Sequence, residues 1–401
     1  MKKIITLIFA VSLLSSAAFA NFFSQRYFEI KVGTSFDVSN NLFSANEYLR
    51  KDLVIDLKKI ADQCPDKGFN LRADMAPELA VNLNIKDFHL GFSSGVDLYE
   101  NLEVGKDLFD FLGYGNTVGE TLDFTITNDL DVFTYSQMNL GFKVGKLKLN
   151  FQPAVFVPVV SVRGAGGKAT VLNDSEGNLN VDVDMNMDVY SVIELKYQDN
   201  KVEFDPASIE AALKTSYGFD LGGGFTYPLS KTLNLGATCR IPVIPGYLYN
   251  KANVNTGFEY KMKITDFSNA EKTSKDITVT NEAAKLAIHR PLKVNAYLDK
   301  NLLGTLFNAR AGGGFGIRRP FSDDAVFYPE YYLGLTLNLI DMLKIGVSTQ
   351  YKDQLFIHQL GTTFNLRLIQ WDFGISTQSS SFKKSLSVAG VGAYTYITVG
   401  F

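Results

Sequence analysis

Apolar and polar side chains alternate along most of this chain with a period of two residues, and the alternation continues to its last residues. Between 332 and 339, leucine occupies every odd position, and the even positions hold Tyr, Gly, Thr and Asn. Similar alternation recurs in segments 28–38, 146–152, 181–189, 343–348, 363–368 and 371–376. A period of two is typical of a β-strand with one apolar and one polar face, because successive side chains point to opposite sides. The sequence therefore predicts an all-β fold.

The apolar faces could belong to a soluble β-sandwich or to a transmembrane β-barrel. A sandwich also alternates, because only its inner face is apolar. A barrel is favoured by an export signal and by segments that reach the roughly 9 to 11 residues of a tilted spanning strand. The last strand favours it too, because its apolar face ends in a terminal aromatic, Phe401, which resembles an outer-membrane assembly signal. Pairing of this strand with the first would leave no open edge in lipid, so we predict a transmembrane antiparallel β-barrel.

The first twenty residues have the features of a secretory signal peptide. Lys2 and Lys3 precede an apolar run from Ile4 to Leu14, and Ala18-Phe19-Ala20 is a small-x-small cleavage site. We expect residues 1–20 to be removed and residues 21–401 to form a single barrel domain in the outer membrane of a diderm bacterium. Its expected partners are outer-membrane lipids and, during insertion, the barrel-assembly machinery.

Charge and composition narrow the remaining partners. The formal net charge is −3 and no run of basic residues occurs, so nucleic acid is excluded as a partner. Cys64 and Cys239 could form one disulfide or remain packed thiols, and the sequence does not decide between these. The aromatic content of 13% fits a barrel with girdles of aromatic residues at both membrane interfaces. We expect these girdles to consist mainly of Tyr and Phe, because the chain has a single Trp. The candidate girdle tyrosines are Tyr328, Tyr331, Tyr351 and Tyr394.

Three segments break the strand pattern and predict helices over 46–62, 102–112 and 205–214. The first follows a capping box, Ser44 to Glu47, and the third begins at Asp205-Pro206. Helices cannot form the wall of a β-barrel, so we expect the segment 40–70 to plug the lumen, with a plain surface helix as the alternative. Two polar stretches, 163–180 and 266–281, are predicted to be extracellular loops, and very short turns are expected around Asp341 and Gln370.

Catalytic and metal-binding motifs are not recognisable in this sequence. The three histidines, His89, His289 and His358, lie apart from one another and from any nucleophile motif, so an outer-membrane lipase is disfavoured. The glycine run 312–316 is better explained by close strand approach or by curvature of a barrel wall than by nucleotide binding. Asp182, Asp184 and Asp188 could hold a cation, although such a face is usually solvated. We therefore predict no enzyme, no metal and no cofactor.

Three segments resemble a known family. Residues 26–30, 53–57 and 105–113 are similar to spirochaete outer-membrane proteins that are regarded as FadL-like. This resemblance implies a barrel of roughly 14 strands, within the range of single-chain barrels, with a lumen plug and passage of hydrophobic substrates such as long-chain fatty acids. The family also carries an Asn-Pro-Ala element before the first strand, whereas the nearest match here is Asp205-Pro206-Ala207.

The resulting hypothesis is an outer-membrane channel for passive uptake of hydrophobic compounds. The substrate would rest in an apolar pocket under the 46–62 helix and leave through the lumen or sideways through the wall. Strand phase selects Lys148, Arg367 and Tyr396 as lumen-facing contacts for a carboxylate head group. The alternatives are a general porin for small polar solutes and a surface-exposed adhesin or structural barrel.

Overall fold

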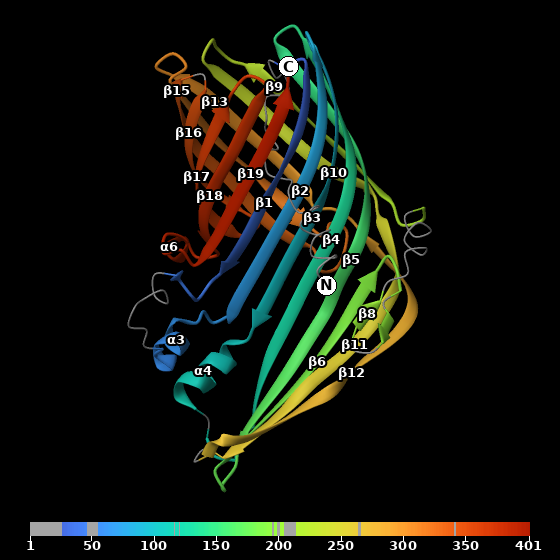
Figure 1. Cartoon of the computed structure of the whole chain (residues 1–401), viewed down its shortest axis with the longest axis vertical. Coiled ribbons are helices and arrows are strands. Elements are labelled where there is room, and N and C mark those ends of the chain that lie inside the picture. The colour runs from blue at the N-terminus through green and yellow to red at the C-terminus, as the bar shows by residue number, and fades with distance from the viewer. Residues whose placement is uncertain are drawn as a thin grey trace.

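The computed structural model describes residues 26–45, 55–115, 117–119, 121–194, 196–198, 201–203, 214–263, 266–340 and 342–401. Within these ranges, one antiparallel sheet of 17 strands closes into a barrel, and β7 (Lys196–Gln198) pairs with β8 (Lys201–Glu203) in a separate small hairpin (Figure 1). The all-β barrel predicted from the period of two is confirmed.

The strands of the closed wall pair in a ring that passes from β5 directly to β9 and from β10 directly to β13. In ring order these strands are β1 (Phe28–Asn40), β2 (Phe69–Ile85), β3 (Phe88–Val104), β4 (Thr121–Val144), β5 (Leu147–Asn173), β9 (Gly218–Pro228), β10 (Leu233–Ile244), β13 (Leu292–Leu302), β14 (Phe307–Arg318), β15 (Val326–Ile340), β16 (Leu343–Lys352), β17 (Leu355–Asn365), β18 (Ile369–Ser379) and β19 (Gly390–Gly400). The last strand pairs with the first, from Glu29↔Gly400 to Ser39↔Gly390, so the ring presents no unpaired edge to lipid.

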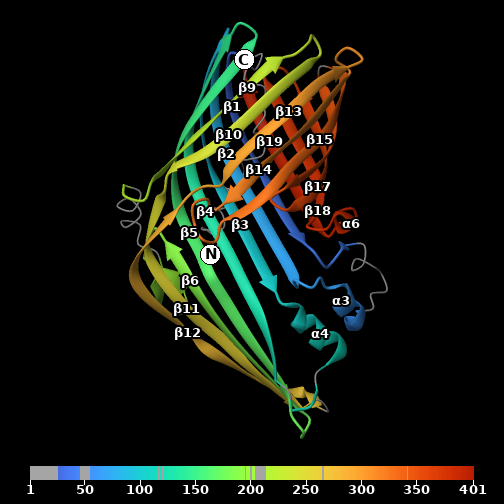
Figure 2. The same ribbon diagram turned by 180° about the vertical axis from the view of Figure 1, so that it is seen from behind.

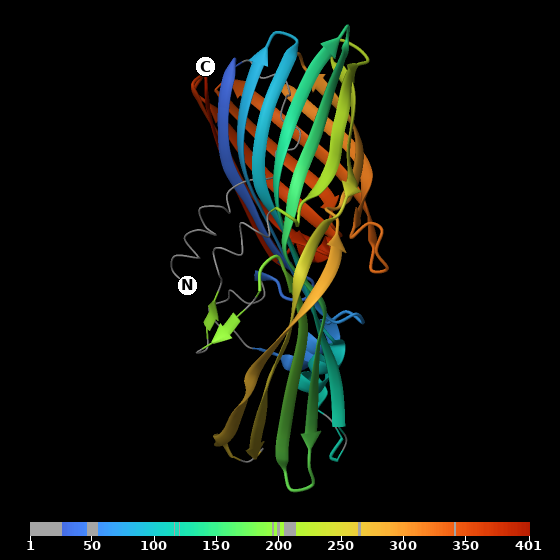
Figure 3. The same cartoon turned by 90° about the vertical axis from the view of Figure 1, so that its right-hand side faces the viewer.

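Three further strands, β6 (Asn178–Ser191), β11 (Gly246–Lys263) and β12 (Asp266–Ile288), lie outside this ring. The first part of β5 pairs with β9, whereas its continuation from Val160 to Asn173 pairs with β6, which in turn pairs with β11. Together with the distal parts of β4 and β5, these strands form a sheet that projects well beyond the barrel, and we call it the extension (Figure 3).

The extension changes the strand count of the sheet and corrects an expectation about loops. The sheet as a whole has 17 strands, more than the roughly 14 expected, although the closed ring takes 14 of them and β6, β11 and β12 are additional. The predicted loops 163–180 and 266–281 are mostly strand. The first contains the end of β5, a turn at 174–177 and the start of β6, and the second lies within β12. Polar composition indicated loops, but a sheet that projects into water can carry polar side chains on both faces.

The connections distinguish the two ends of the barrel. Segments 86–87, 145–146, 229–232, 303–306 and 366–368 join strands at the end that lies uppermost in Figure 1, which we call the short-turn end. The turn expected around Gln370 is instead at 366–368, because Gln370 already belongs to β18, and Asp341 lies outside the described residues. The connections 41–68, 105–120, 319–325 and 380–389 lie at the opposite, long-loop end.

Helices lie at the long-loop end. α3 (Leu57–Gln63) and α4 (Lys106–Tyr114) pack against each other beside the extension, and α6 (Phe382–Ser385) follows β18 (Figures 1 and 2). α4 confirms the second predicted helix with shifted bounds, since 102–104 belong to β3. None of the described helices is long and apolar enough to cross a membrane.

The predicted lumen plug is not found in the described part of segment 40–70. α3 starts only at Leu57, where the Asp56 side chain accepts a hydrogen bond from the Lys59 amide at 3.0 Å, and Ile55 and Asp56 are not helical. Residues 46–54 of the first predicted helix and most of the third, 204–213, lie outside the described residues. α3 packs with α4 beyond the barrel rim because both helices bury apolar side chains there, together with Leu42 and Phe69.

The outer surface of the ring is apolar and carries aromatic clusters near both ends. At the long-loop end, the rings of Tyr331 and Tyr351 stack at 5.6 Å, and Phe356 lies 4.6 Å from Tyr351. At the short-turn end, Trp371 and Phe373 lie 4.6 Å apart. Exposed apolar residues between these clusters are Ile30, Val32, Leu79, Val81, Leu333, Leu335, Val347, Leu360, Ile375 and Ile397. This arrangement is that of a spanning barrel with two interfacial girdles.

Two of the four predicted girdle tyrosines point inward instead. Tyr328 is only 1% exposed and lies below the Lys293 ammonium group, while its neighbour Phe327 is exposed. Tyr394 packs beside Tyr396 inside the ring. The glycine run 312–316 explains how the wall accepts such rings, since a Cβ at Gly316 would overlap the ring of Tyr328. Close strand approach, the predicted role of this run, is confirmed.

Candidate functional site

The lumen is crossed by charged side chains that are bonded to one another, and we call this set the occluding layer. Its members come from strands around most of the ring and are buried or half-buried. They are Arg72, Asp97, Asp220, Arg240, Arg290, Lys293, Arg318, Glu330 and Asp353. Burial of so many charges is tolerated only where each finds a partner of opposite sign or a hydrogen bond.

Arg290 is the centre of one half of the occluding layer. Its side chain is 3% exposed, and it lies 2.8 Å from Asp97 Oδ2 of β3 and 2.9 Å from Asp220 Oδ2 of β9. The guanidinium group also lies over the ring of Tyr135 on β4, 4.2 Å from its centroid. Arg240 of β10 approaches the same Asp97 oxygen at 3.6 Å. One arginine between β12 and β13 therefore joins strands from different parts of the wall through the lumen.

Asp353, in the β16–β17 turn, is the centre of the other half. Its carboxylate accepts from Lys293 Nζ at 3.3 Å and lies 3.8 Å from the Arg318 guanidinium. Lys293 also contacts Glu330 at 3.2 Å, and Arg72 Nη1 donates to the Asp353 carbonyl oxygen at 2.7 Å. These bonds link β2, β13, β14 and β15 to a turn of the rim.

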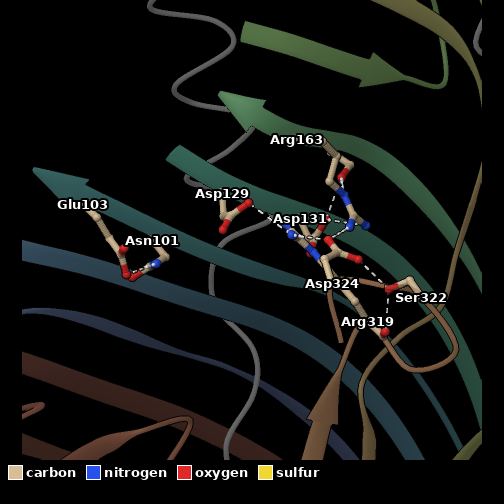
Figure 4. A network of polar contacts seen from close by, with 9 residues as sticks. Asn101, Glu103, Asp129, Asp131, Arg163, Arg319, Ser322 and Asp324 are labelled. Atoms are coloured by element: carbon tan, nitrogen blue, oxygen red, sulfur yellow. Dashed lines mark hydrogen bonds and ion pairs between the residues drawn. The ribbon is translucent and has the colours of Figure 1, made fainter. Parts of the chain in front are cut away.

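Loop 319–325 adds a second set of cross-links at the long-loop end (Figure 4). Arg319, at a φ of +51°, lies 2.9 Å from Asp131 Oδ2 and 3.1 Å from Asp129 Oδ1, both on β4. Arg163 of β5 pairs with Asp324 of the loop and lies 3.6 Å from Asp131. Along the ring, β9, β10 and β13 separate these partners, so the loop reaches over the mouth to another part of the wall.

The strand pattern did not predict the occluding layer. Strand alternation places the members that lie on strands on the inner face, but it says nothing about Arg290 and Asp353, which lie in connections. It also does not show which charges meet, because the partners lie far apart in sequence. The available signal was the number of charged residues at inner positions of spanning strands. Such residues are expensive in a membrane protein unless they line a polar interior.

On the short-turn side of the occluding layer, the barrel has a cavity of about 690 Å³. It lies between the β4–β5 and β9–β10 turns and extends to β13 and β14, and most of its charged lining is cationic. Lys148, one of the three predicted contacts, lines this cavity.

The three predicted contacts are not brought together. Tyr396 is 2% exposed on β19, with Lys31 Nζ 4.4 Å above its ring, and β1 to β4 separate it from Lys148 on β5. Arg367 is wrong as a lumen contact: it is exposed in the 366–368 turn at a φ of +66°, where its carbonyl accepts from Arg26 Nε at 2.7 Å. The alternation pattern predicted an inward side chain at Arg367 because it appears to continue past Asn365, where β17 in fact ends.

The prediction that the histidines lie apart from any nucleophile holds for His89 and His289 but not for His358. His358 Nε2 lies 3.0 Å from Ser385 Oγ, and its Nδ1 lies 2.5 Å from Thr349 Oγ1, a contact that the sequence did not indicate. Ser385 is completely buried, and its hydroxyl donates to the Phe382 carbonyl at 2.6 Å. These contacts attach α6 to the outside of the barrel and leave the hydroxyl inaccessible to a substrate.

The carboxylates of Asp182, Asp184 and Asp188, which were considered for a cation, are engaged by lysines. Lys275 Nζ lies between the carboxylates of Asp182 and Asp184, whose hydrogen bonds raise the pKa of the lysine, and Lys251 lies 3.2 Å from Asp188. Within the described residues, no cluster of metal-ligating side chains occurs. Both cysteines are free thiols rather than a disulfide.

Comparison with known proteins finds similarity only among solved structures. No family model matches the chain, and no curated protein sequence matches it. The P. putida toluene transporter TodX is similar over 95% of this chain and 91% of its own, at 9% identity and a TM-score of 0.47. The CymD monoaromatic hydrocarbon channel covers 94% and 89%, at 10% identity and 0.47. A Pseudomonas aeruginosa FadL homologue covers 96% and 94%, at 11% identity and 0.46. Identities of 9–11% and TM-scores below 0.5 carry no argument about function.

Proposed function

We propose that the protein is an outer-membrane channel for passive uptake of hydrophobic compounds, with its long-loop end outside the cell. The observation that carries this proposal is the contrast between the lumen and the long-loop end. The lumen is crossed by mutually bonded charges, whereas buried apolar side chains gather where α3 and α4 meet the extension. A hydrophobic solute would find its first favourable environment at that end.

Two apolar clusters support this entry site. On the inner face of the extension, Phe124, Val171 and Val183 are buried beneath Leu108 and Phe111 of α4. Beside them, Phe109 of α4 packs with Leu42 and Cys64. One short amphipathic helix therefore covers both clusters, and its displacement would open an apolar surface to a solute. Ligand sites are typically apolar concavities with few polar groups.

A sideways exit is supported by a two-residue stretch where the pairing of β2 with β3 lapses, although the register of the two strands does not change. β2 and β3 pair at Met75↔Leu98 and again at Glu78↔Gly95, but Ala76 and Pro77 have no partner on β3. Proline lacks the amide hydrogen that a ladder needs, which confines it in sheets to edges and irregular positions. A Cβ at Gly95 would overlap the Pro77 carbonyl, so the two strands touch closely there without regular pairing. The occluding layer would direct an apolar solute toward this weak seam.

Two measurements on the purified protein test the proposal. In planar bilayers we expect no steady ohmic conductance, because the occluding layer blocks a continuous water path. In proteoliposomes we expect protein-dependent transfer of pyrene, an uncharged hydrophobic probe, and loss of at least half of that rate for Phe109→Ser at the α4 cluster. The matched control is Phe382→Ser, at an exposed aromatic of α6. Steady conductance without pyrene transfer would instead identify a general porin.

A second candidate function, that of a surface adhesin, is favoured by the extension. It projects beyond the barrel (Figure 3) and exposes ion pairs such as Lys168 with Asp123, at 3.0 Å. An adhesin predicts that Lys168→Glu weakens attachment of cells to their surface ligand while pyrene transfer stays unchanged. Loss of transfer with unchanged attachment would favour the channel.

A further inference from the structure

The short-turn end of the barrel carries exposed cations around its whole circumference. Each of its six turns has one in the turn or within three residues of it, although the chain as a whole has a net charge of −3. Taken one from each turn, they are Lys86, Lys146, Lys231, Lys300, Lys344 and Arg367. Among the described residues of the same segments, the one carboxylate is Asp87, which Lys143 contacts at 3.6 Å. This end is therefore a ring of positive charge.

The same turns expose apolar side chains, where turn residues are usually small or polar. Leu303 is 78% exposed and Val144 is 61% exposed. The remaining turns carry or adjoin Phe88, Leu229, Met342 and Leu366, all of them exposed. Apolar residues at every turn would be unfavourable if this end faced bulk water alone. We therefore looked for a partner that surrounds the barrel and accepts both apolar and cationic groups.

The position of the turns identifies that partner as a lipid layer. Trp371, which marks the aromatic girdle at this end, lies three residues beyond the 366–368 turn. Such girdles lie at the level of the lipid head groups, so the turns reach the layer of the phosphates. A protein partner would cover one sector of the ring, whereas the exposed residues occur on all six turns. Lipids surround every sector.

Lys300 shows that cations at this end reach the lipid side. It lies on β13 between Leu298 and Leu302, at alternate positions of one face, and all three side chains are exposed. The Asp299 side chain lies on the opposite face, where it pairs with Arg310. A lysine on the lipid-facing side near a membrane interface extends its ammonium group toward the head groups. Within the described residues, neither Lys300 nor Lys86 nor Lys231 forms an ion pair.

We propose that the short-turn end is a collar that binds anionic phospholipids of the leaflet it reaches. The exposed cations contact the lipid phosphates, and the apolar turn residues lie among the first carbons of the acyl chains. Neutral phospholipids satisfy the apolar residues equally well, so the cations add a preference for negative head groups. The collar is independent of what passes through the barrel.

The test compares lipids in contact with the protein in phosphatidylcholine vesicles, by electron paramagnetic resonance of spin-labelled phosphatidylglycerol and phosphatidylcholine. We expect the protein to prefer phosphatidylglycerol about threefold in 0.1 M salt, and to lose most of that preference in about 1 M salt. The variant Lys86→Gln/Lys231→Gln/Lys300→Gln/Arg367→Gln should bind both lipids nearly equally. The matched control removes four exposed lysines of the extension, Lys168→Gln/Lys261→Gln/Lys263→Gln/Lys272→Gln, and should keep the full preference.

A smaller change keeps the test valid if the four-site collar variant does not assemble. Lys86→Gln/Lys231→Gln and Lys300→Gln/Arg367→Gln should then each remove about half of the preference. The native Trp371, which is 45% exposed, locates the bound lipid. At equal mole fractions, its fluorescence should be quenched more by brominated phosphatidylglycerol than by brominated phosphatidylcholine.

Four results would overturn the collar. Equal binding of both lipids by the unmodified protein would leave these turns to a protein partner or to water. An intact preference in all the collar variants, or its loss in the extension control, would place the lipid elsewhere. Equal quenching of Trp371 by the two brominated lipids would move the bound lipid away from this end. Removal of the preference by inorganic phosphate, but not by chloride of the same ionic strength, would make this a site for a free anion.

Discussion

Replacement of Arg290 by methionine tests whether the lumen is truly occluded. Methionine keeps an unbranched side chain beside Tyr135 but removes the charge between Asp97 and Asp220. Asp220 is 1% exposed, so it would be left as a buried carboxylate without its ion pair, while Asp97 would retain Arg240 at 3.6 Å. Removing one partner of a buried pair costs about 3–5 kcal/mol, and we expect the free energy of unfolding to fall by that amount.

Urea unfolding in phosphatidylcholine vesicles, followed through the single tryptophan Trp371, measures this loss. The variant Arg290→Met/Asp220→Asn also removes the carboxylate that loses its ion pair and leaves Asp97 with Arg240. It should recover most of the stability, with a deficit of roughly 1–2 kcal/mol from unpaired polar groups. Lys168→Met breaks an exposed ion pair and should cost less than about 1 kcal/mol. Arg290→Met should also allow measurable ion conductance in planar bilayers.

A loss within about 1 kcal/mol for Arg290→Met would contradict this reasoning, since it would mean that Asp97 and Asp220 are hydrated. The reasoning would also fail if Arg290→Met/Asp220→Asn were as unstable as Arg290→Met. In that case the arginine would act through packing on Tyr135 rather than through charge.

Three further predictions concern other parts of the molecule. Arg319→Gln should release loop 319–325 from β4, so that a protease cleaves the loop at least tenfold faster. Peptide mapping of protease-treated intact vesicles measures this rate. Unchanged cleavage would mean that the pair of Arg163 with Asp324 is sufficient to hold the loop. Burial raises the pKa of the Cys64 thiol to about 11, so alkylation of this thiol at pH 8 should be slow. The alkylation rate should rise about tenfold per pH unit until the pH reaches the pKa. A rate equal to that of a free thiol would refute the burial of Cys64. Gly316→Ala should lower the free energy of unfolding by about 1–3 kcal/mol through overlap with the Tyr328 ring, and Tyr328→Ala in the same chain should remove the additional loss.

Much of the barrel wall was predictable from the sequence alone. β1 was expected at 28–38 and runs from Phe28 to Asn40, and the last strand pairs with it as the closure argument required. The outward positions of Tyr331 and Tyr351 also agree with prediction. These features follow from the alternation of apolar and polar residues within each single strand. A strand with lipid on one face and a polar interior on the other requires that alternation, whatever its neighbours are.

Polarity was less informative about where strands end. Segments 163–180 and 266–281 have the composition of loops, yet they complete the extension by pairing among β5, β6, β11 and β12. Arg367 was assigned to a strand although it lies two residues beyond the end of β17 at Asn365, since nothing local marks the turn at 366–368. The end of a strand depends on whether a partner is available beside it, which single-strand patterns do not contain.

The order of the residues is enough to predict a closed wall of two-faced strands, with apolar residues outside and polar residues inside. The role of the inner charges emerges only in the folded chain, because Arg290, Asp97 and Asp220 meet across the lumen from positions far apart in the sequence. The cavity at the short-turn end likewise arises from the way β5, β9 and the neighbouring turns are brought together. Alternation is a property of consecutive residues, whereas ion pairs and cavities depend on distances that exist only after the ring has closed.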